Sequence, residues 1–230
     1  MMRTARLVAA GMLVAGGLSA QTVSTGADIV SRYVWRGYDF GESMAVQPSV
    51  SFEAVGLEVA AWGSYSISAS GAGANEIDLT ASYTLRTDGG AGVSAGITDY
   101  YFPSPGGLGL READAHNLEL FAALLGPESL SFTLFGGLMF DLDNSVYVEA
   151  GVPILAGTEV ELDVHAGAVA GKSAFYGTET GALVSVAVTA RRFLRITDSY
   201  APPASVSLIA NPHQNGRAFL VFKLGLIPVR

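Results

Sequence analysis

A strict two-residue alternation of apolar and polar side chains constrains the fold of this chain more than any other feature. Between Ile77 and Arg86, every second residue is apolar, from Ile77 through Leu85, and the residues between them are polar. Because successive side chains of a β-strand point to opposite faces, this pattern predicts a strand with one apolar and one polar face. The apolar face turns inward in a soluble sheet and outward, toward lipid, in an outer-membrane barrel.

Segments with similar alternation recur along the chain, separated by turn residues. We predict an all-β fold, an antiparallel transmembrane β-barrel of about 12 strands, with about 10 as the lower bound. Most segments are close to the ~9–11 residues that a tilted strand needs to cross a membrane. The predicted strands are 27–36, 45–53, 57–67, 76–86, 91–98, 116–124, 130–140, 145–154, 158–168, 183–196, 204–210 and 217–226.

The connections between these segments alternate in length. Tight turns are predicted at 55–56, 88–90, 127–128 and 156–157, and longer loops at 37–44, 68–75, 100–115 and 171–181. The short loop 141–144 and the longer turn 198–203 depart from this order. Outer-membrane barrels have brief periplasmic turns and longer external loops, whereas a soluble sandwich has no reason to sort its loops in this way.

The first twenty residues have the three parts of a secretory signal peptide. Arg3 and Arg6 give a charged start, 7–18 is an apolar run, and Ser19 and Ala20 form a small-residue exit. The apolar run is shorter than the roughly 20 residues of a membrane-spanning helix. We therefore predict a signal peptide at 1–20, a barrel domain at 21–230, and export to the bacterial outer membrane.

Composition narrows the partners that we expect. The net charge is −8, and the predicted leader carries basic residues but no acids, so the mature chain is still more acidic. Nucleic-acid binding rewards basic patches, so we expect no nucleic-acid partner. The chain has no cysteine, which excludes a disulfide framework and a thiolate metal site. We expect no cofactor, and partners limited to outer-membrane lipid and small polar solutes or ions; the sequence does not determine the oligomeric state.

Charged side chains gather on the polar faces of the predicted strands, where a membrane barrel would place them in its lumen. Glu159, Glu161, Asp163 and His165 form the densest polar stripe. This stripe either sets a cation preference or binds a metal, or it is paired with Arg191 and Arg195 on the next strand. The candidate lumen-lining residues are Arg32, Arg36, Glu58, Asp78, Glu119, Glu149, Glu159, Glu161, Asp163, His165, Arg191 and Arg195.

Two further groups of side chains each have two interpretations. Arg32 and Arg36 either line a constriction or pair with Glu53 and Glu58. Four aromatic side chains fall toward strand ends on the apolar face, which suits an interfacial aromatic girdle. Ordinary packing in a soluble core is the alternative. The four aromatic residues are Tyr33, Trp35, Tyr65 and Tyr83.

The histidines give little indication of catalysis. His165 shares a predicted face with Asp163, and His116 follows Glu112 and Asp114. A serine hydrolase needs a serine, an imidazole and a carboxylate within hydrogen-bond reach, and the chain has no Gly-x-Ser-x-Gly motif. We predict no catalytic residue and no enzymatic activity.

The order of several short motifs resembles the TorF-type porin family of uncharacterised bacterial outer-membrane proteins. The motifs are Tyr-Val-Trp-Arg-Gly at 33–37, Ala-Val-Gln-Pro at 45–48, Trp-Gly-Ser at 62–64, His-Asn-Leu-Glu-Leu at 116–120 and Tyr-Val-Glu at 147–149. The resemblance is strongest from 31 to 64. It implies a β-barrel with a channel role and brings no established substrate or catalytic residue.

Taken with the alternation, the resemblance predicts passive passage of small polar solutes or ions through an outer-membrane barrel. Three alternatives remain: a structural or interaction barrel with a plugged lumen, an outer-membrane hydrolase, and a soluble, periplasmic, lipocalin-like barrel with its apolar residues inward. The position of the apolar face separates the last alternative from the others.

Overall fold

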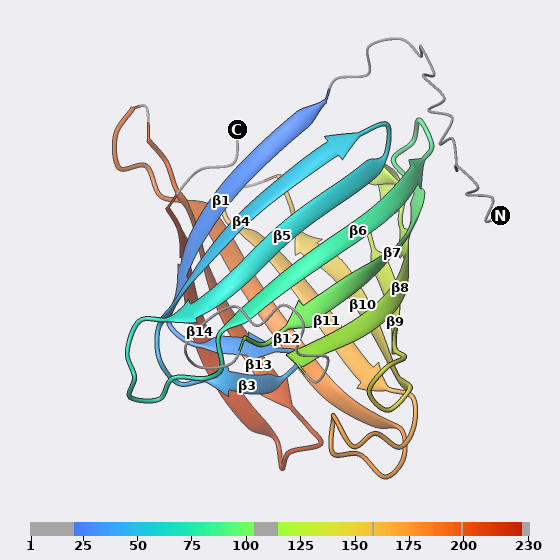
Figure 1. Ribbon diagram of the computed structural model, residues 1–230. Coiled ribbons are helices and arrows are strands. Elements are labelled where there is room, and N and C mark those ends of the chain that lie inside the picture. The colour runs from blue at the N-terminus through green and yellow to red at the C-terminus, as the bar shows by residue number, and fades with distance from the viewer. Residues whose placement is uncertain (1–20, 104–114, 158, 199, 227–230) are drawn as a thin grey trace, which may run out of the picture.

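A computed structural model describes residues 21–103, 115–157, 159–198 and 200–226, and the predicted signal peptide lies outside them. Twelve antiparallel strands form a closed barrel, in which β1 pairs with both β4 and β14 (Figure 1). The described chain includes a short 3-10 helix, η2 (Glu128–Leu130), and no helix among the described residues has the length and apolar character of a membrane span. The barrel strands are β1 (Thr22–Val30), β4 (Ala45–Ala54), β5 (Leu57–Ser66), β6 (Glu76–Arg86), β7 (Gly92–Tyr101), β8 (His116–Leu125), β9 (Thr133–Met139), β10 (Ser145–Leu155), β11 (Glu161–Val169), β12 (Ala182–Phe193), β13 (Pro203–Asn211) and β14 (Arg217–Gly225).

The apolar face of the barrel points outward. On β6, Leu79 is 52% exposed, whereas Ser82 on the opposite face is 8% exposed. The same order holds on β10, where Val146 and Val148 are exposed and Tyr147 between them is buried. An apolar exterior around a polar interior is the arrangement of outer-membrane barrels and the reverse of a lipocalin-like barrel.

The connections sort by length between the two ends of the barrel, as predicted. The tight turn at Val55 and Gly56 has φ values of 53° and 83°, which match a two-residue type I′ hairpin. This turn lies at the end where β1 begins and β14 ends, as do the connections that follow β6, β8, β10 and β12. The connections at the opposite end follow β1, β5, β7, β9, β11 and β13, and they include most of the longer ones.

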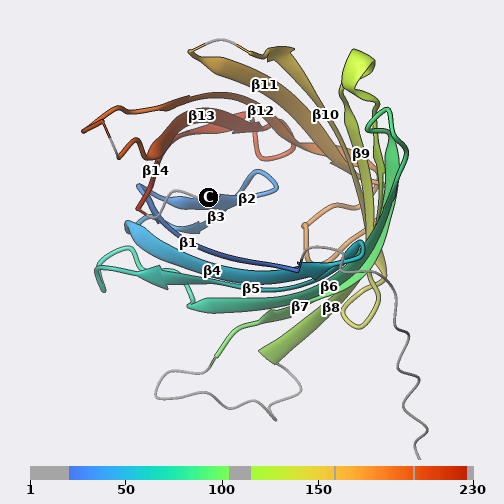
Figure 2. The same cartoon turned by 90° about the horizontal axis from the view of Figure 1, so that it is seen from above.

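The first predicted strand, 27–36, is wrong in its second half. The chain leaves the barrel wall after Val30 and forms a small hairpin of β2 (Tyr33–Trp35) and β3 (Tyr38–Gly41) before it returns as β4. Viewed along the barrel, this hairpin lies within the ring of strands (Figure 2). As a result, β1 pairs with β14 over three residue pairs and with β4 over nine. We call residues 31–44 the lumenal segment.

Candidate functional site: a hairpin inside the barrel

The tip of the β2–β3 hairpin is a sharp turn that packs against the far wall. Arg36 and Gly37 both have positive φ values, 48° and 81°. A Cβ atom at Gly37 would lie 2.0 Å from the carbonyl oxygen of Val184 on β12, so this close approach requires glycine. The side-chain Nδ2 of Asn211 on β13 donates to the carbonyl oxygen of Gly37 over 3.3 Å. The hairpin therefore crosses the lumen from β1 and β4 to β12 and β13.

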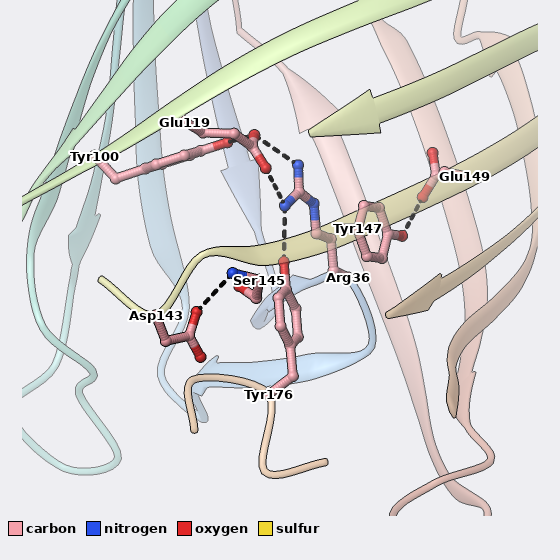
Figure 3. Close-up of polar contacts among 8 residues, drawn as sticks. All are labelled: Arg36, Tyr100, Glu119, Asp143, Ser145, Tyr147, Glu149 and Tyr176. Atoms are coloured by element: carbon pink, nitrogen blue, oxygen red, sulfur yellow. Dashed lines mark hydrogen bonds and ion pairs between the residues drawn. The ribbon is translucent and has the colours of Figure 1, made fainter. Parts of the chain in front are cut away.

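The guanidinium group of Arg36 forms the main polar contact between the hairpin and the wall. Its Nη1 and Nη2 donate to the two carboxylate oxygens of Glu119 on β8, over 2.7 and 2.8 Å (Figure 3). The side chains of Arg36 and Glu119 are 9% and 2% exposed. Tyr100 on β7 donates to Glu119 over 2.8 Å, and Arg36 also donates to the hydroxyl oxygen of Tyr176 over 2.8 Å. Such a bidentate pair fixes direction as well as distance.

Aromatic rings surround the same guanidinium group. The Arg36 Cζ atom lies 4.2 Å from the ring centre of Trp35 and 4.1 Å from that of Tyr147. Tyr176 stacks on both rings, with centroid distances of 6.2 and 5.9 Å. Arginine over an aromatic face gains about 2 kcal/mol or more when the contact is desolvated. The charge of Arg36 is thus compensated by one carboxylate and by the faces of neighbouring rings.

The loop between β11 and β12 supplies Tyr176 and is held by Asp143, from the loop between β9 and β10. The Asp143 carboxylate accepts hydrogen bonds from the Ser173 hydroxyl over 2.7 Å and the Phe175 backbone N–H over 3.1 Å. It also accepts one from the Ser145 backbone N–H over 3.0 Å (Figure 3). Partial burial raises the pKa of Asp143, but these hydrogen bonds outweigh burial and hold its pKa below the usual value. The β11–β12 loop therefore lies at the same end of the lumen as the hairpin, which it contacts through Tyr176.

Open space remains in the lumen on the short-turn side of the hairpin. A cavity of about 460 Å³ is lined by Glu149, Glu161, Asp163, His165 and Arg191. A second cavity of about 280 Å³ shares Glu149 and His165 with it and reaches Trp35, Arg36 and Gly37 at the hairpin tip. Three of the four residues of the predicted polar stripe, Glu161, Asp163 and His165, therefore line a polar vestibule that ends at the hairpin.

The predicted arginine partners need correction. Arg36 pairs with Glu119, and Arg32 pairs within the lumenal segment with Asp39 and Glu42, over 3.7 and 3.6 Å. Neither arginine pairs with Glu53 or Glu58, which lie opposite each other on β4 and β5. The lumenal segment turns inward before the two arginines. Their partners therefore differ from the residues that a continuous strand would place beside them.

The acidic stripe is brought together in part. The Asp163 carboxylate pairs with Arg191 over 2.8 Å, as the salt-bridge interpretation predicts. Glu159 precedes β11 and Arg195 follows β12, so both lie outside the strands and are exposed. Asp78 lies on the inner face of β6, and Glu149 on β10 accepts a hydrogen bond from the Tyr147 hydroxyl over 2.6 Å.

Two of the four aromatic predictions also need correction. Tyr33 and Trp35 lie in the lumenal hairpin, so they belong to no outer girdle. Tyr65 and Tyr83 are 38% and 48% exposed, as outward-facing residues. Val184 is fully buried in the cluster with Tyr147 and Tyr176, close to the point where the β11–β12 register shifts.

No catalytic arrangement is evident among the described residues. The His165 Nε2 lies 3.4 Å from the Ser185 hydroxyl. Among the described residues, no carboxylate forms a hydrogen bond with His165. His116 pairs with Asp99 over 2.9 Å, without a serine in that pair. The described chain also contains no group of three or more histidine or carboxylate side chains placed to bind a metal.

A closed antiparallel barrel with an apolar exterior, a polar lumen and a folded-in hairpin defines the class of this protein. The chain belongs to a family of bacterial proteins of unknown function, designated Gcw_chp, whose profile matches residues 14–180. No curated protein and no solved structure matches the chain. The family match does not extend to the TorF-type porins, and that resemblance stays a prediction.

Proposed function

We propose that this protein is an outer-membrane channel for small polar solutes or ions, closed by the lumenal segment. The observation that carries the proposal is the Arg36–Glu119 pair, which fastens a separate hairpin across a polar lumen. Because the hairpin is not part of the barrel wall, its displacement would open the lumen and leave the strand pairing of the wall intact. The vestibule lined by Glu149 and His165 would then continue past the hairpin.

The exterior supports a membrane location for this channel. Large apolar side chains are exposed around the barrel, including Phe52 on β4, Leu120 on β8 and Leu208 on β13. A water-exposed surface of this kind would be an aggregation liability, whereas lipid solvates it. We infer the bacterial outer membrane as the location, since closed barrels are the strand architecture that satisfies every backbone group in lipid.

Conductance in a planar lipid bilayer tests the proposal. We expect rare or small openings from the natural chain and a steady, larger conductance when residues 33–41 are replaced by a glycine-serine linker of equal length. R36A should increase the frequency of openings, because it removes the pair that fastens the hairpin to β8. The matched control is K172A, which breaks an ion pair with Glu179 in which both side chains are exposed. A linker variant that folds and never conducts would contradict the channel.

A structural or interaction barrel is the second candidate, and the closed lumen favours it. The hairpin, the Tyr176 loop and the walls are joined by several hydrogen bonds and ring contacts, a construction that a permanently closed barrel would also need. A folded linker variant without conductance would support this candidate. Neither candidate includes enzymatic activity.

A further inference from the structure

The outer surface of the barrel has an apolar groove across the junction of its first and last strands. Its volume is about 650 Å³, within the ~300–1,000 Å³ that sites for small molecules occupy. Met44, Phe222 and Leu224 line the groove and are exposed. The buried, lumen-facing side chains of Val30 and Val221 do not line it, so the groove opens outward, on the face that meets lipid in a membrane.

The strand register explains the shape of this groove. Leu224 pairs with Ile29 on one side and with Ala204 on the other, and Ala204 in turn pairs with Arg192. These four residues form one outward-facing row across β1, β14, β13 and β12, which are successive strands of the wall (Figure 1). Neighbouring strands are about 4.8 Å apart, so the row is about 14 Å long. Ala204, and Ala190 in the next row, are short side chains that leave a depression between longer ones.

Three basic residues line the groove, and Arg192 is the one of the three without an acidic partner in the described chain. Arg191 pairs with Asp163 over 2.8 Å. Lys223 pairs with Asp28 over 2.6 Å. Arg192 is exposed and is the last residue but one of β12, on the outer face. A guanidinium group matches the geometry of a phosphate with two parallel N–H donors, so the end of an apolar groove carries a group suited to phosphate.

We propose that the groove binds one phospholipid, with an acyl chain along the row from Ile29 to Ala204 and the phosphate group at Arg192. This inference rests on the membrane location proposed above. The short-turn end of an outer-membrane barrel faces the periplasm, and Arg192 lies at that end. The bound lipid therefore belongs to the periplasmic leaflet, which consists of phospholipid. An apolar groove that ends at a cation fits the two parts of such a molecule, its acyl chain and its phosphate.

The bound lipid would cover the shortest strand pairing of the wall. β1 and β14 pair over three residue pairs, and their pairing ends at Ser31. The Ser31 backbone N–H donates to the Phe222 carbonyl oxygen over 2.8 Å, and the Ser31 hydroxyl oxygen accepts from the Phe222 backbone N–H over 3.0 Å. Both residues line the groove. A lipid across these strands would stabilise the junction, and this role does not require that the barrel conducts.

Native mass spectrometry of the folded full chain in maltoside micelles tests the site. The probes are phosphatidylglycerol and a diacylglycerol with the same acyl chains but no phosphate. We expect one phosphatidylglycerol per chain at saturation, and at least about tenfold weaker binding of the diacylglycerol, because a hydrogen bond to a charged group is worth about that factor. R192Q should weaken phosphatidylglycerol binding to the level of the diacylglycerol. A204F should weaken the binding of both lipids, because the added ring fills the groove.

Two matched controls lie on β6, outside the groove. R86Q removes an exposed arginine at the same end of the barrel, and A81F adds the same ring to the outer face. Both should keep the natural affinity. Equal affinity for the two lipids, or natural affinity in R192Q, would show that Arg192 only reaches water and would overturn the proposal. Tighter binding of lipid A than of phosphatidylglycerol would overturn the assignment to the periplasmic leaflet. A barrel that binds the phospholipid and never conducts would contradict the channel alone.

Discussion

Arg36 and Glu119 show how much of the closed lumen depends on single residues. Both side chains are almost fully buried, and each is satisfied by the other and by a tyrosine hydroxyl. A buried pair gains little over a well-packed apolar pair, but the loss of one partner leaves an uncompensated charge. This asymmetry makes Arg36 the residue whose replacement should affect the hairpin most.

We expect R36A to lower the free energy of unfolding by about 3–5 kcal/mol, since it leaves the Glu119 carboxylate buried without its cation. The matched control K172A should cost less than about 1 kcal/mol, because Lys172 and Glu179 are 71% and 83% exposed. Denaturant unfolding of both variants in lipid vesicles measures the difference. An R36A variant as stable as K172A would contradict the buried pair.

Gly37 gives a second prediction at this scale. G37A adds a Cβ that meets the Val184 carbonyl oxygen and also forces alanine into positive φ. G216A is the matched control, because Gly216 has a φ of 70° and no atom within 4 Å of an added Cβ. Left-handed backbone alone costs about 1–2 kcal/mol, and overpacking adds about 1–3 kcal/mol. Equal destabilisation of the two variants in denaturant unfolding would show that the hairpin tip does not touch β12.

The residue types of the site could be predicted from the sequence, but its contacts could not. Arg36 and Glu119 are both polar-face residues of predicted strands, so a lumenal position followed from alternation alone. They are 83 residues apart, and no local pattern specifies which of the lumenal carboxylates an arginine meets. Tyr176 lies in a loop, where alternation gives no face at all, so its contact with Arg36 was beyond sequence reasoning.

At the scale of elements, the twelve wall strands follow from alternation, whereas the hairpin does not. Each wall strand except β1 was predicted to within a few residues, because one face meets an apolar and the other a polar environment. Arg32 and Arg36 alternate with Tyr33 and Trp35, so the pattern predicts one continuous strand where the chain turns inward. That turn depends on distant contacts of Gly37 with β12 and β13. The sequence feature that could have indicated this turn is Gly37, which lies among closely spaced aromatic residues.

The Asp143 contacts give a prediction for the β11–β12 loop. The pKa of Asp143 is lowered in the folded state, so its contribution to stability is fully present above the unfolded pKa of about 3.9 and is lost as pH falls through the folded pKa. D143N should reduce amide-exchange protection of residues 173–178 at neutral pH and remove this acid dependence. Protection factors corrected for intrinsic exchange measure both effects.

The control for this experiment is E179Q, in the same loop, whose carboxylate is exposed and pairs with Lys172. E179Q should keep the protection of the loop and its acid dependence. If D143N and E179Q behave alike, Asp143 does not hold the loop.

At the scale of the whole molecule, the apolar exterior predicts a depth-dependent cost for charge. Ala81 faces outward near the middle of β6, and Leu85 faces outward near its end. A81R should destabilise the barrel in lipid vesicles by about 2–4 kcal/mol and L85R by about 0–1 kcal/mol, because the penalty is greatest at the bilayer midplane. Equal costs at the two positions would argue against a bilayer around β6.

The most direct test of the central claim is the solvent around each face of β6. The chain has no cysteine, so single cysteines at consecutive positions from 77 to 85 can each carry one spin label. In lipid vesicles, labels at odd positions should collide with oxygen, which dissolves in lipid. Labels at even positions should be shielded from it. The opposite phase, or no alternation, would contradict a barrel with its apolar face in the membrane.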